Sequence, residues 1–119
     1  MLISEILEGA AREYPHKAAV WFEGEWRTYA EVSREANRVA SYLIDIGVQP
    51  GERVALLLEN SFDYISGHFG VHKAGAVEVS LNTELKADEI SRLLVDCEAR
   101  VLISGLIRRQ SGGGRLYPA

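Results

Sequence analysis

The chain has 119 residues, 47% of them hydrophobic and 25% charged, which is enough for about one domain with an apolar core. This composition lies near the average of globular proteins and excludes disordered, fibrous and disulfide-rich classes. The formal net charge of −4 at pH 7 argues against a nucleic-acid-binding protein, because phosphates are neutralised by clustered cations on a folded face.

Export and membrane insertion are not expected. The single cysteine, Cys97, cannot form an internal disulfide, which favours a reducing compartment. The first residues lack the positive charge of a signal peptide, and no apolar run approaches the roughly 20 residues that are needed to span a bilayer. We therefore expect a soluble cytoplasmic protein.

The first predicted elements are a helix and a hairpin. Apolar residues recur at helical intervals between Leu2 and Tyr14, and Pro15 ends the pattern, so we expect a short amphipathic helix there. The runs AAVWF at 18–22 and EWRTY at 25–29 flank a glycine-containing turn, which predicts two antiparallel strands.

A long helix should follow the hairpin. Thr28 and Glu31 have the spacing of a capping box, in which each side chain accepts a hydrogen bond from a backbone N–H of the first turn. Gly47 is suited to end the helix, because glycine readily adopts the left-handed conformation. The predicted buried stripe consists of Val32, Ala36, Val39, Ala40, Leu43 and Ile46.

Two strand and helix units come next. The nearly continuous apolar run at 53–58 predicts a strand that is buried on both faces, and Asn60 is placed to cap the following helix. Gly75 ends that helix before a second apolar strand at 76–80. The predicted core residues of the helix are Phe62, Ile65, Phe69 and either Val71 or His72.

A third unit completes the pattern. A polar loop at 81–88 leads into a helix and then into an apolar strand at 100–104. Strands alternating with helices of about ten to fifteen residues are typical of a parallel sheet with right-handed crossovers. The predicted fold class is therefore α/β: a partial doubly wound parallel sheet of order β-α-β-α-β at 53–104, preceded by a helix, an antiparallel hairpin and a long helix. The apolar stripe of the last helix consists of Ile90, Leu93, Leu94 and Cys97.

The end of the sequence differs from the rest. Residues 105–119 contain three consecutive glycines, three arginines and no acidic residue, without apolar periodicity. We predict an α/β subdomain at 1–104 and an irregular tail rich in glycine and arginine at 105–119. A sheet of three parallel strands leaves unpaired edges and uncovered apolar faces, so we expect a homo-oligomer that forms through them.

Two stretches carry a family resemblance. They are WRTYAEVSREANRVASYLIDIGVQPGERVALLLENS at 26–61 and GHFGVHKAGAVEVSLNTELKADEISRLLVDCEARVLI at 67–103. In order and spacing they resemble the N-terminal part of the adenylate-forming (AMP-binding) ligases, which include acyl-CoA synthetases and the adenylation domains of peptide synthetases. The chain has Ser80 and Thr83 where the family often has prolines, so we expect a less rigid loop there.

The resemblance implies a reaction and its cofactors. Family members join a carboxylate to ATP, with Mg²⁺, to give an acyl-adenylate, and many then transfer the acyl group to CoA. The family's phosphate-binding loop, which ends in Pro-Lys-Gly, and its later acidic motifs do not occur in these 119 residues. We therefore predict the N-terminal part of an acyl-CoA synthetase-like ligase, inactive alone, without catalytic residues or a bound cofactor.

A second interpretation is a stand-alone α/β module without catalysis, which binds a ligand or assembles with copies of itself. Open α/β sheets bind ligands at the carboxyl ends of their strands. These ends lie near Asn60, Ser80 to Thr83 and Ser104.

Histidine and cysteine side chains are the candidate metal ligands of this sequence. His68 and His72 have the i, i+4 spacing of two zinc ligands, but no third ligand is evident, because Cys97 and His16 are far away in the sequence. We therefore predict no metal site. Cys97 is expected to pack as a small hydrophobic residue.

Other suggestive residues are expected to have ordinary roles. The run SGGGR at 111–115 lacks the lysine and the flanking helix of a phosphate loop, and Arg108 and Arg109 are expected to be solvated. The aromatic residues of the hairpin region are expected to lie in the core rather than to stack on a ligand; they are Trp21, Trp26 and Tyr29.

Overall fold

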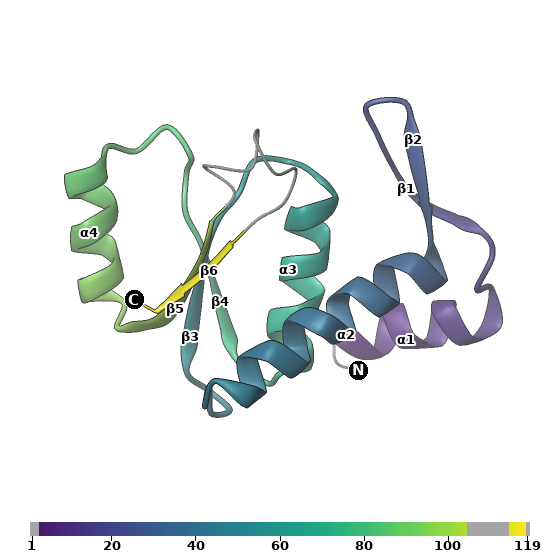
Figure 1. Ribbon diagram of the computed structural model, residues 1–119, viewed down its shortest axis with the longest axis horizontal. Coiled ribbons are helices and arrows are strands. Elements are labelled where there is room, and N and C mark those ends of the chain that lie inside the picture. Colours follow the sequence, from purple (N-terminus) through teal and green to yellow (C-terminus); the bar gives the residue numbers. More distant parts are fainter. Residues whose placement is uncertain (1–2, 105–114, 119) are drawn as a thin grey trace.

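The computed structural model describes residues 3–104 and 115–118 (Figure 1). Its elements are α1 (Ile3–Glu13), β1 (Ala18–Phe22), β2 (Glu25–Thr28), α2 (Tyr29–Asp45), β3 (Arg53–Leu57), α3 (Phe62–Lys73), β4 (Val77–Ser80), α4 (Ala87–Asp96), β5 (Ala99–Ser104) and β6 (Arg115–Pro118). The strands form a hairpin, β1-β2, and a four-stranded sheet of order β4-β3-β5-β6. The predicted α/β class, with its preceding helix, hairpin and long helix, is confirmed.

The central strand of the sheet is β3, which pairs in parallel with β4 and with β5. Its residues from Val54 to Leu57 are at most 1% exposed, because helices cover both faces: Figure 1 shows α4 on one side of the sheet and α2 with α3 on the other. Since side chains alternate along a strand, Val54 and Leu56 pack toward α2 and α3, whereas Ala55 faces α4.

Strand β6 corrects part of the prediction for the tail. Residues 105–119 were expected to be irregular, but Arg115–Pro118 pair antiparallel with β5. Tyr117 is of a residue type that is frequent in strands, and a proline is tolerated at the end of an edge strand. The pattern is short and follows three glycines and an arginine, so the sequence alone did not indicate a strand. The remaining part of the tail, including SGGGR up to residue 114, Arg108 and Arg109, lies outside the described residues.

The predicted signals at helix ends are confirmed, with one shift. The N–H of Thr28 donates to Oε1 of Glu31 at 2.8 Å, and the N–H of Glu31 donates to Oγ1 of Thr28 at 3.2 Å, so the capping box of α2 is complete. Gly47, with φ of +96°, ends the same helix. The cap of α3 is Ser61 rather than Asn60, because the Ser61 backbone is extended and its Oγ accepts from the N–H of Tyr64 at 3.1 Å.

The buried face of α3 differs from the predicted one. Small residues line it, because α2 crosses at close range: a Cβ on Gly70 would lie 2.5 Å from Cβ of Val39 and 3.0 Å from the carbonyl oxygen of Ala36. The fully buried residues of α3 are Ser66, Gly67, Gly70 and Val71. Of the predicted core residues, Val71 is fully buried. Ile65 and Phe69 are half-buried and pack against the buried residues of α1 and α2, and Phe62 is half-buried.

Two apolar clusters hold the layers together. The larger one fills the space between the sheet and the helices α2 and α3; it contains Ala40, Leu43, Val48, Val54, Leu56, Leu58, Val71, Ala74, Ala76, Val101 and Ile103. The smaller one joins α1 to α2, around Leu7, Val32 and Ala36. The predicted stripe of α2 is thus confirmed except for Ile46, which is 37% exposed.

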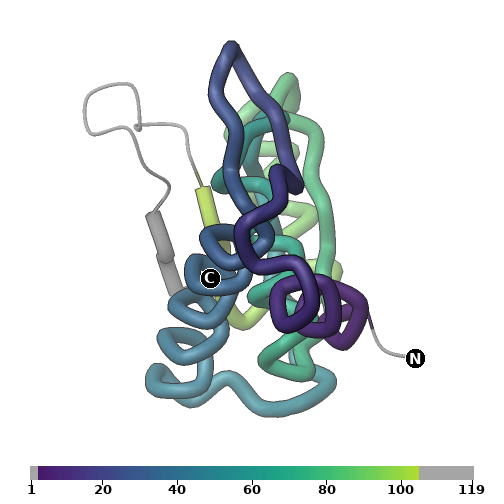
Figure 2. Tube along the Cα trace, turned by 90° about the vertical axis from the view of Figure 1, so that its right-hand side faces the viewer, coloured from purple at the N-terminus to yellow at the C-terminus, as the bar shows by residue number. Residues whose placement is uncertain are grey.

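The hairpin extends beyond the helices in both views of the molecule (Figures 1 and 2). Its turn has positive φ angles at Glu23 and Gly24, as two-residue hairpin turns require. Trp21 lies opposite Trp26, with ring centroids 6.5 Å apart, and these side chains are 56% and 59% exposed. The prediction that both tryptophans are core residues is wrong, because none of the helices in the described residues covers this face of the hairpin. Tyr29 does pack against the smaller cluster.

Among the helices of the described residues, α4 is the least closely packed against the rest of the protein. Ile90, Leu94 and Cys97 of its predicted stripe are half-buried, but none of its residues is fully buried, and Leu93 is 39% exposed. None of the helices in the described part of the chain combines the length and the apolar character that crossing a bilayer requires.

Candidate functional site

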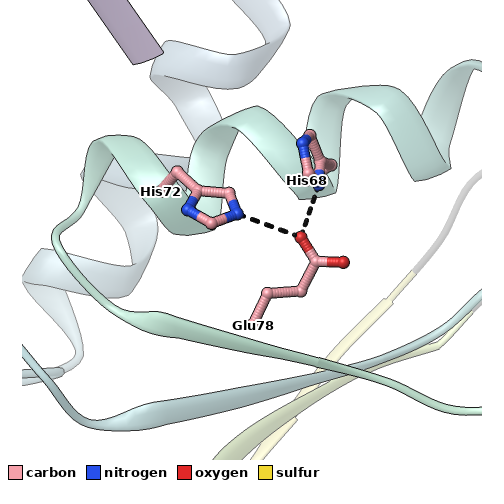
Figure 3. A group of neighbouring side chains, drawn as sticks. All are labelled: His68, His72 and Glu78. Atoms are coloured by element: carbon pink, nitrogen blue, oxygen red, sulfur yellow. Dashed lines mark hydrogen bonds and ion pairs between the residues drawn. The ribbon is translucent and has the colours of Figure 1, made fainter. Parts of the chain in front are cut away.

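Helix α3 and strand β4 bring three ionisable side chains together (Figure 3). His68 and His72 are one helical turn apart, so both project from the same face of α3. The turn at Gly75, with φ of +78°, reverses the chain into β4, which runs back beside the helix. Glu78 on that strand points toward the two imidazoles.

The two histidines share one carboxylate oxygen. Oε1 of Glu78 lies 2.5 Å from Nδ1 of His68 and 3.4 Å from Nε2 of His72, and the two imidazole rings meet edge to face with centroids 4.8 Å apart. The Glu78 side chain is only 11% exposed, whereas those of His68 and His72 are 30% and 29% exposed. The carboxylate is therefore shielded from water, and the imidazoles lie between it and the solvent.

The second carboxylate oxygen is also bound. Oγ of Ser80 donates to Oε2 of Glu78 at 2.5 Å, and the Tyr64 hydroxyl lies 3.1 Å from Oγ of Ser80. A buried carboxylate is tolerated when its oxygens accept hydrogen bonds, and these contacts meet that condition. The network of polar side chains around Glu78 thus reaches from the two histidines on α3 to Ser80, at the carboxyl end of β4, and to Tyr64, in the first turn of α3.

Sequence reasoning missed Glu78 as a partner of the two histidines. Cys97 and His16 were the residues considered, and neither joins them: Cys97 ends α4 on the other side of the sheet, and His16 is exposed between α1 and β1. The signal for Glu78 was its position inside the apolar strand AVEVS, because a carboxylate in such a strand needs a polar partner. Glu78 is thus a third ligand group beside the two histidines, contrary to the expectation from the sequence that none lies near.

The residues expected at the carboxyl ends of the strands have separate roles. Asn60 borders a small cavity of about 180 Å³ between the hairpin and the start of α3, below the roughly 300 Å³ of a typical ligand pocket. In the segment from Ser80 to Thr83, Ser80 joins the Glu78 network and Asn82 accepts a hydrogen bond from the Glu84 N–H at 2.9 Å. Ser104 is buried.

A wider cleft of about 730 Å³ separates the hairpin from α2 and α3. Its charged side chains are Glu23, Glu25, Arg27, Glu35, Arg38 and Asp63, so carboxylates outnumber guanidinium groups. One guanidinium is engaged already: Arg27 lies 4.1 Å from the ring centroid of Phe62 and 3.7 Å from a carboxylate oxygen of Glu25.

This cleft does not fit a nucleoside triphosphate. A helix N-terminus favours phosphate through its free N–H groups, but the N-terminus of α3 has Asp63 in its first turn and the hydroxyl of Ser61 already bound to one N–H. The excess of carboxylates along the cleft would repel the phosphates further. No phosphate-binding step is therefore assigned to the described residues.

Comparison with known proteins gives consistent matches. Residues 7–114 match the family described as AMP-binding enzyme. A feruloyl-CoA synthase of Amycolatopsis is 45% identical over 93 residues, which are 78% of this chain and 19% of the synthase. A long-chain-fatty-acid–CoA ligase of Mycobacterium tuberculosis is 44% identical over 78 residues, which are 66% of this chain and 16% of the ligase.

The fold is similar to that of solved structures as well. The crystal structure of an anthranilate CoA ligase in complex with anthranoyl-AMP has a TM-score of 0.80 and 38% identity, over 86% of this chain and 20% of that ligase. The chain therefore spans about a fifth or less of the length of these three relatives.

Proposed function

The chain belongs to the family of AMP-binding enzymes, and we propose that it forms the N-terminal part of an acyl-CoA synthetase-like ligase. Such a ligase joins a carboxylate to ATP, with Mg²⁺, to give an acyl-adenylate and pyrophosphate, and then transfers the acyl group to CoA. The names of three relatives, a CoA synthase and two CoA ligases, support CoA as the acceptor; peptide synthetases also match, such as gramicidin S synthase 2 over 86% of this chain, and their names do not include CoA. We expect this reaction to take place in the cytoplasm.

Two observations support the proposal: the chain matches the family, and helix α4 covers its face of the sheet without a fully buried residue. Domains of this class cover both faces of the sheet with packed helices, yet α4 buries none of its residues fully. Leu93 and Val95 are 39% and 76% exposed. Further parts of a ligase that pack over α4 would bury these side chains. In the complete ligase, the subdomain would then pack behind the nucleotide and acyl sites and support them.

We propose further that the chain alone does not form an acyl-adenylate. The motifs that hold phosphates and Mg²⁺ in the family do not occur in the sequence, and the charged side chains of the large cleft repel phosphate. Pyrophosphate release should be measured with ATP, Mg²⁺ and three acids that the relatives' names suggest: a long-chain fatty acid, ferulate and anthranilate. We expect no release above the acid-free control.

A complete CoA ligase assayed in parallel provides the positive control. Acid-dependent pyrophosphate release by this chain, persisting after repeated chromatography and growing in proportion to its concentration, would show that the chain itself binds ATP and forms the acyl-adenylate. That outcome would overturn the proposed inactivity without affecting the family membership.

The isolated chain is also proposed to associate with a second copy of itself. Among the described residues, strand β4 is hydrogen-bonded to β3 alone, so within this part of the chain its other edge presents unpaired backbone groups, and Val77 on this strand is 48% exposed. Uncovered edges and apolar side chains promote association between identical chains.

A further inference from the structure

We propose that His68, His72 and Glu78 bind a Zn²⁺ ion through two imidazole nitrogens and one carboxylate oxygen. The proposal does not depend on the ligase reaction, because the three residues lie between α3 and β4, apart from the cleft that borders the hairpin. It rests on the position of their atoms, on the type of ligand and on the groups that orient the carboxylate.

The ligand atoms are already close enough to share an ion. One atom from each of the three residues lies within 4.8 Å of the other two. Zinc bonds of about 2.0–2.1 Å in tetrahedral geometry place two ligand atoms about 3.4 Å apart, and Nε2 of His72 lies 3.4 Å from Oε1 of Glu78. Nδ1 of His68 lies 2.5 Å from the same oxygen, so binding of the ion requires these two atoms to separate by about 0.9 Å on this geometry.

The set of ligands favours zinc over the common hard cations. Two imidazoles with one carboxylate are a known ligand set for zinc in proteins, with a fourth position left for water. Mg²⁺ and Ca²⁺ prefer sites made of oxygen atoms. Because the histidine side chains are about 30% exposed, the ion can reach them from solvent and keep a water molecule on its open side.

The surroundings hold the ligands in place. The two histidines are fixed one turn apart on α3, and Glu78 lies on a strand that is hydrogen-bonded to β3. Oγ of Ser80 binds Oε2 of Glu78 and is itself in contact with the Tyr64 hydroxyl, so Oε1 is directed toward the imidazoles. Such outer contacts orient carboxylate ligands and strengthen metal binding.

A direct titration distinguishes a metal site from a simple hydrogen-bonded cluster. The full chain, without a histidine tag and freed of metal with a chelator, should be titrated with Zn²⁺ in a calorimeter and with Co²⁺ in a spectrophotometer. We expect one equivalent of Zn²⁺ to bind, and Co²⁺ to give the visible absorption of a four-coordinate site.

Matched variants locate the ion. Loss of a hydrogen bond to a metal ligand weakens metal binding by about 10- to 100-fold. Loss of a ligand itself should weaken it at least as much, so we expect His72→Ala and Glu78→Ala each to weaken Zn²⁺ binding by at least about tenfold. Two controls, His16→Ala and Cys97→Ser, remove other potential ligands and should bind as tightly as the wild type. Circular dichroism verifies the folding of each variant, and His68→Gln replaces any variant that fails to fold.

Two results would overturn the proposal. One is wild-type affinity for Zn²⁺ no higher than that of His72→Ala. The other is equal weakening by His16→Ala or Cys97→Ser, which would place the ion elsewhere. Nitrogen NMR of the histidine rings adds a readout at atomic level, because the shifts on adding Zn²⁺ should identify Nδ1 of His68 and Nε2 of His72 as the bound atoms.

Discussion

Gly70 is the residue that determines how closely α2 and α3 approach each other. A Cβ at this position would lie 2.5 Å from Cβ of Val39, so Gly70→Ala forces the helices apart. Overpacking of this kind costs about 1–3 kcal/mol, and the higher helix propensity of alanine offsets roughly 1 kcal/mol of that strain. We therefore expect a net loss of up to about 2 kcal/mol in the free energy of unfolding measured with urea.

Gly9 provides the matched control for this substitution. It also lies in a helix, α1, but a Cβ there would meet no atom within 4 Å. Gly9→Ala should therefore stabilise the protein by roughly 0.5–1 kcal/mol. If Gly70→Ala were as stable as Gly9→Ala, the close packing of α2 on α3 would be refuted.

Glu31 makes the start of α2 sensitive to acid. Hydrogen bonds from the backbone N–H and the side chain of Thr28 hold the pKa of Glu31 below its ordinary value. Because this pKa is lower in the folded chain than in the unfolded one, the ionised carboxylate stabilises the fold at neutral pH. That contribution is lost as the pH falls through the folded-state pKa.

Glu31→Gln tests this pH dependence, because it removes the charge and keeps the shape. We expect the variant to be less stable than the wild type in urea unfolding at neutral pH. This difference in stability should disappear at pH values below the ordinary pKa range of a glutamate. Thr28→Ala, which removes the hydroxyl cap, should cost about 1 kcal/mol at neutral pH. A difference between wild type and Glu31→Gln that stays constant from neutral to acidic pH would contradict the assignment.

At the scale of elements, β4 carries the edge proposed for self-association, and α4 presents a second exposed apolar surface, at Leu93 and Val95. Light scattering at tens of micromolar, where exposed apolar surfaces associate, should show species larger than the monomer. A lysine on an edge strand opposes pairing between chains, so Val77→Lys should shift the distribution toward monomer, and Val95→Lys should do the same if α4 contributes. A wild-type monomer at these concentrations would count against the proposal.

Local signals made most elements predictable from the sequence. The capping box at Thr28 and the glycine at position 47 mark the limits of α2, and the apolar run at 53–58 marks the central strand, because each depends on neighbouring residues only. The buried face of α3 was not predictable from hydrophobicity. It depends on the distance between α2 and α3, which is so short at Gly70 that no side chain fits between the helices there.

The contact of Glu78 with the two histidines was also not predictable from local sequence patterns. The spacing of His68 and His72 reveals that they share a helix face, but their partner Glu78 comes from the next strand, so its proximity depends on how α3 packs against β4. Strand β6 was missed for a related reason: Arg115–Pro118 is too short to show a pattern of its own, and its regular structure comes from pairing with β5.

At the scale of the whole molecule, the fold is that of the N-terminal part of an AMP-binding enzyme, with one closely packed face of the sheet and one loosely covered face. The sheet is covered closely by α2 and α3 through the larger apolar cluster, whereas α4 covers the opposite face with no fully buried residue. This asymmetry accounts for both proposed behaviours: self-association of the chain alone, and packing against further layers within a complete ligase.

A graft into the M. tuberculosis long-chain-fatty-acid–CoA ligase tests the central claim most directly. The 78 matching residues of that ligase, with which this chain is 44% identical, would be replaced by their counterparts from this chain, and acyl-CoA formation would be measured. If the chain is the N-terminal part of such a ligase, the chimera should retain activity within about tenfold of the parent, a difference of roughly 1.4 kcal/mol in activation free energy. A folded, monodisperse chimera that forms no acyl-CoA would contradict the claim.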